Sequence, residues 1–201
     1  MKLLRPFGPS IGISIIPQDI FLELNNITDS VLKNKNLQEN ISFNFLTSDY
    51  KSSYPVKKQF KLMLTKEISD WIKYQILAYV TEYNKQIPYK DQPLSNIRKI
   101  SINACWFNSM TTGEDLPPHQ HHGTVSGVLY CKIPTDALPT DGIISFVNTS
   151  CSDELEMASI QVRPIEKQMY LFPSRLIHSV TGIHSDQERR SISFNAFINY
   201  D

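Results

Sequence analysis

The second half of this chain consists of short β-prone runs separated by turn signals, and this pattern limits the fold more than any other feature of the sequence. We expect strands at residues 100–108, 124–133, 142–148, 158–163, 167–172 and 190–199. Short strands at such spacing are typical of an antiparallel barrel or sandwich, with jelly-roll closure among the possibilities. The pattern therefore predicts a mainly β core.

The first half of the chain predicts a strand and two helices beside that core. Residues 10–16 alternate in polarity as a strand does, and an apolar stripe at helical spacing follows from about Pro17. A second helical stripe begins after Thr65, a residue type favoured as an N-cap, and this helix should end before Pro88. We therefore expect flanking helices at the N-terminal side of a β domain.

Length and composition fit one domain. The chain has 201 residues, of which 41% are hydrophobic, so it can bury a full core. Residues 34–56 are rich in Asn, Ser and Lys and are loop-like, but no flexible linker marks the change of pattern near residue 97. We expect a single domain, 1–201, in which residues 1–97 support a core at residues 98–201.

The charge balance argues against a broad electrostatic surface. The chain carries 20 basic and 20 acidic residues, which gives no support to binding of duplex nucleic acid or anionic lipid. Pro6, Pro9 and Pro17 interrupt the apolar residues near the N-terminus, so we expect neither a signal peptide nor a membrane span. Nothing in the sequence indicates an oligomeric state.

The cysteines indicate a reducing compartment. Cys105, Cys131 and Cys151 are odd in number, widely spaced and form no CxxC pair, which argues against a disulfide framework. We expect a cytoplasmic protein whose cysteines are small core residues.

The histidines are concentrated in one part of the chain and point to a metal site. All five lie between His119 and His184, three of them within four residues, and imidazole is the commonest protein ligand of first-row transition metals. If the first cluster is a strand, His119 and His121 share a face, and His178 on a neighbouring strand would supply a third ligand. The alternative is a polar loop that exposes its histidines by accident.

The last predicted strand has a polar face and an apolar face. Arg189, Ser191, Ser193 and Asn195 share one parity. Such a row either faces solvent or faces a polar ligand inside the core, because unpaired polar groups are costly to bury. Together with the histidines, Arg189 and Ser191 predict an anion clamp, since a guanidinium grips a carboxylate with two hydrogen bonds.

Several motifs over residues 100–199 resemble the 2-oxoglutarate and Fe(II)-dependent oxygenases of the small prolyl-hydroxylase-like type. The most specific are a Phe-Pro-Ser run that leads into His178 and an Arg-x-Ser eleven residues after that histidine. The other matching stretches are Trp106-Phe107-Asn108, His119-Gln120-His121, Ser126-Gly127-Val128-Leu129-Tyr130 and Ser193-Phe194-Asn195.

This resemblance implies a double-stranded β-helix, a jelly-roll barrel of the cupin-like kind, with iron at its open end. Arg189 and Ser191 would bind the far carboxylate of 2-oxoglutarate, and Tyr130 and Asn195 would complete the cosubstrate site. The implied activity is a dioxygenase, specifically a hydroxylase, that releases succinate and carbon dioxide. Its substrate would be a small molecule or a peptide that the sequence does not identify.

One position departs from the usual iron site of two histidines and one carboxylate. His121 stands where Asp or Glu is usual, so the expected ligands are His119, His121 and His178. Three neutral imidazoles make the site more positive by one charge, which favours an anionic cosubstrate and also zinc or nickel. The alternatives are that His122 replaces His121, or that a loop carboxylate completes the site, namely Glu114, Asp115 or Asp141. His184 is expected to be a solvated bystander.

Two other functions fit parts of this pattern. A cupin-like enzyme would use three histidines without 2-oxoglutarate, but Val125 stands where its motif usually has Glu. An inactive barrel that serves as a binding module is the other alternative, because Lys167 replaces a glycine that commonly precedes the last ligand strand. Trp106, Tyr130 and Tyr170 are expected either to line the pocket or to be ordinary core aromatics.

Overall fold

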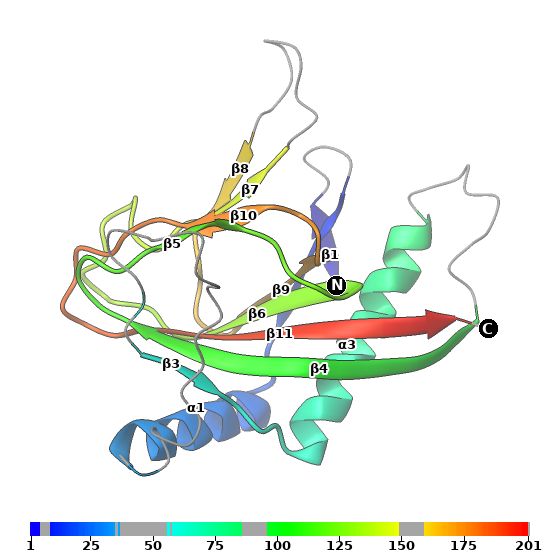
Figure 1. Ribbon diagram of the computed structural model, residues 1–201, viewed down its shortest axis with the longest axis horizontal. Coiled ribbons are helices and arrows are strands. Elements are labelled where there is room, and N and C mark those ends of the chain that lie inside the picture. The colour runs from blue at the N-terminus through cyan, green and yellow to red at the C-terminus, as the bar shows by residue number, and fades with distance from the viewer. Residues whose placement is uncertain are drawn as a thin grey trace.

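A computed structural model describes residues 1–4, 9–34, 36, 56, 58–85, 96–148 and 159–200, and within these ranges the chain forms two antiparallel sheets and two flanking helices (Figure 1). The helices are α1 (Gln18–Lys33) and α3 (Lys66–Lys85). No described helix is long and apolar enough to cross a membrane.

The larger sheet has seven strands in the order β1-β2-β9-β6-β11-β4-β3. Their bounds are β1 Lys2–Leu4, β2 Ile11–Ile15, β9 Gln168–Pro173, β6 Val125–Lys132, β11 Arg189–Tyr200, β4 Ile97–Met110 and β3 Lys58–Lys61. The smaller sheet has the order β5-β10-β7-β8, with β5 Leu116–His119, β10 His178–Val180, β7 Ile144–Val147 and β8 Ser159–Val162. Strands distant in sequence are thus hydrogen-bonded neighbours in both sheets.

Both faces of the larger sheet are covered. Its outer face packs on the helices, because α1 buries a stripe that includes Ile20 and Leu24 and α3 buries a matching stripe that includes Ile68 and Ile72. Its inner face packs against the smaller sheet through a second apolar cluster around Phe146. The central strands are therefore buried on both sides.

The helices confirm the prediction from periodicity. Both begin within one residue of the expected positions, and the Oγ1 of Thr65 accepts a hydrogen bond from the backbone N–H of Ile68 at 3.3 Å, as an N-cap does. The second helix ends at Lys85, before Pro88 as expected. The predicted loop at 34–56 lies almost wholly outside the described residues.

All six expected strands of the second half are present, but four further strands were not expected. These are β1, β3, β5 and β10, each of four residues or fewer. None of them lies within a long β-prone run bounded by turn signals, which is the pattern that marked the expected strands. Because β2 and β3 lie in the larger sheet, the first half of the chain supplies strands as well as helices. The single-domain division stays a prediction.

Candidate metal and anion site

Three of the five histidines meet in one cluster. The potential ligand atoms of His119, His121 and His178 all lie within 4.8 Å of one another. The ring centroids are separated by 4.4 Å for His119 and His178, 4.9 Å for His119 and His121, and 5.0 Å for His121 and His178. The structure thus brings together the three histidines that the sequence singled out.

The local structure that positions these histidines differs from the expected one. His119 is the last residue of β5 and pairs in register with His178, the first residue of β10. His121 lies beyond the end of β5, so the expectation that it shares a strand face with His119 is wrong. A turn at Gly123, whose φ is +150°, follows His121. Local loop geometry, and not strand alternation, places the His121 ring.

Two of the histidines are oriented by backbone carbonyls. The Nδ1 of His119 lies 2.7 Å from the carbonyl oxygen of Pro117, and the Nδ1 of His178 lies 2.9 Å from that of Leu176. A carbonyl can only accept, so each Nδ1 carries the proton and donates it, which leaves the lone pair of each Nε2 for a ligand bond. This arrangement is the usual support of a metal-binding histidine.

Burial keeps the cluster neutral, which metal binding requires. Burial, with a smaller contribution from the nearby His119, lowers the pKa of His178 to about 3. Burial and the neighbouring histidines together lower the pKa of His121 to about 2, and burial lowers the pKa of His119. Three neutral nitrogen donors suit a first-row transition metal. The residues present therefore fit the iron that the resemblance implies.

The alternative ligands do not join the cluster within the described part of the chain. His122 is exposed and its Nδ1 lies 3.3 Å from Arg175. Glu114 is buried but accepts a hydrogen bond from the backbone of Thr111 at 3.3 Å. Asp115 is half-buried just before β5 and is also outside the cluster.

Asp141 and His184 form a separate pair. The Oδ1 of Asp141 lies 2.7 Å from the Nδ1 of His184, whose side chain is 67% exposed. Burial alone would raise the pKa of Asp141, but hydrogen bonds from His184 and from backbone N–H groups outweigh it and lower this pKa below its ordinary value. His184 is thus exposed and lies away from the metal cluster, as expected from the sequence.

Arg189 extends into the core without an acidic partner. Its side chain is buried, and among the described residues no carboxylate forms an ion pair with it. The guanidinium donates weak hydrogen bonds of 3.3 Å to Ser191 Oγ and to the carbonyl of Gly142, and 3.4 Å to the sulfur of Met110. Its Nε makes no hydrogen bond in the described structure. A buried cation in this state is suited to an anionic ligand.

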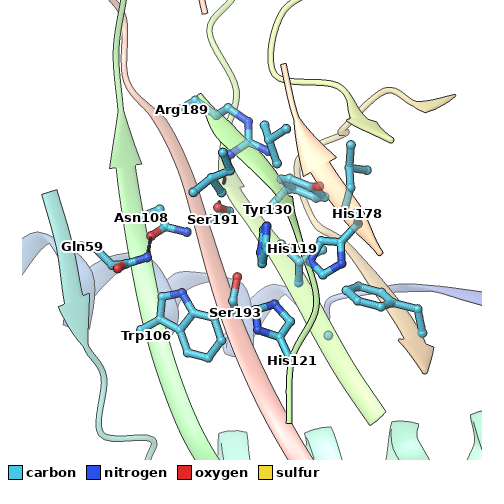
Figure 2. A pocket seen from close by; sticks show the side chains of 16 residues that line it. Gln59, Trp106, Asn108, His119, His121, Tyr130, His178, Arg189, Ser191 and Ser193 are labelled. Atoms are coloured by element: carbon cyan, nitrogen blue, oxygen red, sulfur yellow. Dashed lines mark hydrogen bonds between the residues drawn. The ribbon is translucent and has the colours of Figure 1, made fainter. Parts of the chain in front are cut away.

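A row of polar side chains crosses four strands beside Arg189. The register pairs Gln59 of β3 with Asn108 of β4, Asn108 with Ser191 of β11, and Ser191 with Tyr130 of β6. The amide of Gln59 donates to Asn108 Oδ1 at 2.8 Å (Figure 2). The Tyr130 ring lies 5.2 Å from the Arg189 guanidinium. Sequence reasoning missed Gln59, because a four-residue strand far from the motifs gives no signal.

One cavity, part of which is open to solvent, joins the histidines to Arg189. Figure 2 shows their side chains directed into the same space. Its lining residues are Gln59, Trp106, Asn108, Leu116, His119, His121, Gly127, Val128, Tyr130, Ile144, Phe172, His178, Val180, Arg189, Ser191 and Ser193. Tyr170 stacks edge-on against Tyr130 outside this lining. Asn195 also lies outside it and accepts a hydrogen bond from Ser126 at 2.7 Å.

Comparisons with known proteins agree with the geometry. Residues 104–195 match the model of a family described as "Putative 2OG-Fe(II) oxygenase". Among curated protein sequences, none matches the chain.

Solved structures share the fold at low sequence identity. A prolyl-4-hydroxylase from Pseudomonas putida is 14% identical, with a TM-score of 0.56 over 95% of this chain and 92% of that one. A Trichoplax adhaerens prolyl hydroxylase, in complex with a hypoxia inducible factor peptide fragment, is 14% identical, with a TM-score of 0.57 and coverage of 95% and 83%. HygX from Streptomyces hygroscopicus, with nickel and 2-oxoglutarate bound, is 9% identical, with a TM-score of 0.59 and coverage of 95% and 83%.

These similarities confirm the double-stranded β-helix that the sequence predicted. The family match agrees with the predicted cofactors, Fe(II) and 2-oxoglutarate. The match over residues 104–195 and the shared fold agree with the 2-oxoglutarate-dependent non-haem iron oxygenase that the sequence predicted.

Proposed function

We propose that the protein is a hydroxylase in which His119, His121 and His178 hold Fe(II). In the same proposal, Arg189 and Ser191 bind the far carboxylate of 2-oxoglutarate. The observation that carries it is the buried Arg189 guanidinium, which has no acidic partner among the described residues and lines the same cavity as the three histidines. A metal site and an anion site in one cavity are the two requirements for a chelating dicarboxylate cosubstrate.

When bound, iron with 2-oxoglutarate and dioxygen supplies the oxidation: a C–H bond of the substrate becomes C–OH while 2-oxoglutarate becomes succinate and carbon dioxide. The protein supplies position and charge. His119 and His178 are preoriented by the carbonyls of Pro117 and Leu176, so they lose little freedom on binding metal. The guanidinium of Arg189 fixes the cosubstrate, with the Ser191 hydroxyl as a second donor.

Tyr130 has a supporting part in the proposal. Its ring lies against the Arg189 guanidinium, and burial raises the pKa of its hydroxyl, although nearby Arg189 opposes this effect. A protonated phenol can donate to the cosubstrate carboxylate. The sequence assigned Asn195 to the cosubstrate site, but its side chain accepts a hydrogen bond from Ser126 outside the cavity lining, so we do not give it that role.

Apolar side chains line part of the cavity wall beside the histidines. Phe172 lies edge-on to His178 with ring centroids 4.8 Å apart, and Ile144 and Val180 are buried beside it. A dry site strengthens the interaction between Arg189 and a carboxylate. We expect the apolar wall to protect the reaction from unproductive exchange with solvent.

The substrate in this proposal is a small molecule or a peptide. Beyond the histidines and Arg189, the described lining carries neutral groups, among them Gln59, Asn108 and Trp106. The Trichoplax adhaerens neighbour was solved with a peptide fragment, which makes peptides one substrate class to test.

Cys105 and Cys131 are free and buried, as predicted, and this supports a cytoplasmic location. Cys151 lies outside the described residues.

The test is an anaerobic titration of the Fe(II)-loaded protein with 2-oxoglutarate, followed by visible absorption and calorimetry. We expect a weak charge-transfer band that saturates with one equivalent, and slow succinate release once air is admitted. Iron binding without the band or heat of binding would overturn the proposal in favour of a cupin-like enzyme. A folded protein that retains no iron would favour the inactive barrel.

A further inference from the structure

Three motifs that the proposed function leaves unused meet in one buried network. The hydroxyl of Ser126 on β6 lies 2.7 Å from Asn195 Oδ1 on β11 and 2.9 Å from the hydroxyl of Ser174, just after β9. The exposed fractions of Ser126, Ser174 and Asn195 are 1%, 1% and 3%. Polar groups this deep stabilise a fold only when they are hydrogen-bonded, so the network links three strands specifically.

The hydrogen bonds of this network have a definite order from donor to acceptor. A serine hydroxyl has one proton to donate, and Asn195 Oδ1 can only accept. Ser126 therefore donates to Asn195, and Ser174 donates to Ser126. The chain of bonds ends at Asn195, where β11 shifts its register against β4. This gives Ser174 a fixed position relative to the central strands of the larger sheet.

Ser174 in turn holds the loop that carries His121. Its carbonyl oxygen accepts the backbone N–H of His121 at 2.8 Å, and its N–H donates to the carbonyl of Thr124 at 3.2 Å. Between these two contacts, a Cβ added at Gly123 would lie 2.9 Å from Ser174 Oγ. The loop is thus closely packed on Ser174 at both of its ends.

We propose that Ser126, Ser174 and Asn195 are positioning residues for His121, the ligand that stands where iron sites usually have a carboxylate. The other two histidines pair with one another on adjacent strands, whereas His121 lies in a loop and takes its position from the loop backbone. The inference rests on the metal site of the proposed function. It does not depend on the use of 2-oxoglutarate.

The test measures Co(II) affinity and the visible Co(II) absorption bands, which report coordination geometry, in Ser126→Ala and Asn195→Ala variants. We expect each variant to bind Co(II) about tenfold more weakly, with altered bands, as is usual for groups that orient a ligand. The matched control is Ser109→Ala. Ser109 is a buried serine that donates to Glu188 at 2.7 Å, away from the cavity lining. It should lose similar thermal stability but keep its Co(II) affinity within twofold.

The same substitution in a His121→Ala background identifies the ligand through which the network acts. Ser126→Ala should then change the already weakened affinity by less than twofold, because the residue that it positions is absent. A continued tenfold effect, or an equal loss in Ser109→Ala, would overturn the inference. If the wild-type protein binds no Co(II), both the proposed metal site and the positioning role of the network are ruled out. If it binds Co(II) but not 2-oxoglutarate, only the proposed cosubstrate fails.

Discussion

Arg189 and Arg190 are adjacent in the sequence, equally buried, and opposite in their electrostatic environment. Arg190 donates two hydrogen bonds to Glu188, at 2.7 and 2.8 Å, and one to Asp29 at 2.6 Å. Arg189, on the other face of β11, has no such partner in the described structure. One arginine is neutralised by the fold, and the other carries a charge that a ligand can neutralise.

Replacing Arg189 should separate stability from binding. In Arg189→Met, we expect 2-oxoglutarate to bind about 100-fold more weakly, which corresponds to about 2.7 kcal/mol, because a charged partner of the carboxylate is lost. The free energy of unfolding, measured without ligands, should stay the same or rise by up to about 1 kcal/mol, because a buried unpaired charge is removed. Calorimetry and urea unfolding measure the two effects. Equal losses of metal and cosubstrate affinity would show that Arg189 has been misassigned.

Gly142 limits the position of the Arg189 side chain. Its φ is +58°, and a Cβ there would lie 2.7 Å from Arg189 Nε. Gly142→Ala should therefore displace the guanidinium and weaken 2-oxoglutarate binding about tenfold, with a loss of about 1 kcal/mol in stability. Gly182→Ala is the control, because a Cβ there meets nothing within 4 Å. Similar cosubstrate affinity in both variants would contradict the prediction.

The Arg190 cluster predicts a pH-dependent stability. Burial alone would raise the pKa of Glu188, but hydrogen bonds from Arg190 and Ser109 outweigh it and hold this pKa below 4.5. A carboxyl whose pKa is lower in the folded state stabilises the protein above its unfolded pKa, and this contribution is lost as pH falls through the folded pKa. Arg190→Met should cost about 2 kcal/mol at pH 7, allowing for solvent screening at the partly exposed Asp29.

Urea unfolding of Arg190→Met and the unchanged protein at pH 7, 5 and 3 measures this contribution. The difference between the two proteins should be constant from pH 7 to 5 and should narrow at pH 3. Any contribution of the histidines is common to both proteins, so it cancels in the difference. A difference in unfolding free energy that is the same at pH 7, 5 and 3 would argue against the ion pairs as its source.

The residue at position 121 should determine the net charge of the metal site. His121→Asp restores the usual carboxylate and makes the site less positive by one charge, so we expect it to retain iron but to bind 2-oxoglutarate roughly tenfold more weakly. Its affinity for nickel should also fall, because an imidazole donor is lost. His122→Asp makes the same charge change at an exposed neighbour outside the cluster and should have little effect. A competition titration with nickel compares the three proteins.

Much of the fold could be predicted because its information is local. The stripes of α1 and α3 repeat over many residues, and the expected strands lie in longer β-prone runs bounded by turn signals, so both kinds of element can be recognised. The short strands β1, β3, β5 and β10 could not be predicted because no such run marks them, and β3, β5 and β10 also pair with strands distant in sequence. Gln59 reaches the cavity only through that pairing.

By itself, the sequence determined the kinds of groups in the site: the clustered histidines and the Arg-x-Ser beside them. The tertiary structure decided which of them meet. It brought His121 to the cluster through a loop, excluded Asp141 by pairing it with His184, and assigned Asn195 to a buried network. The physical reason is that periodicity specifies which residues share a face, whereas long-range packing and hydrogen bonding determine what that face contacts.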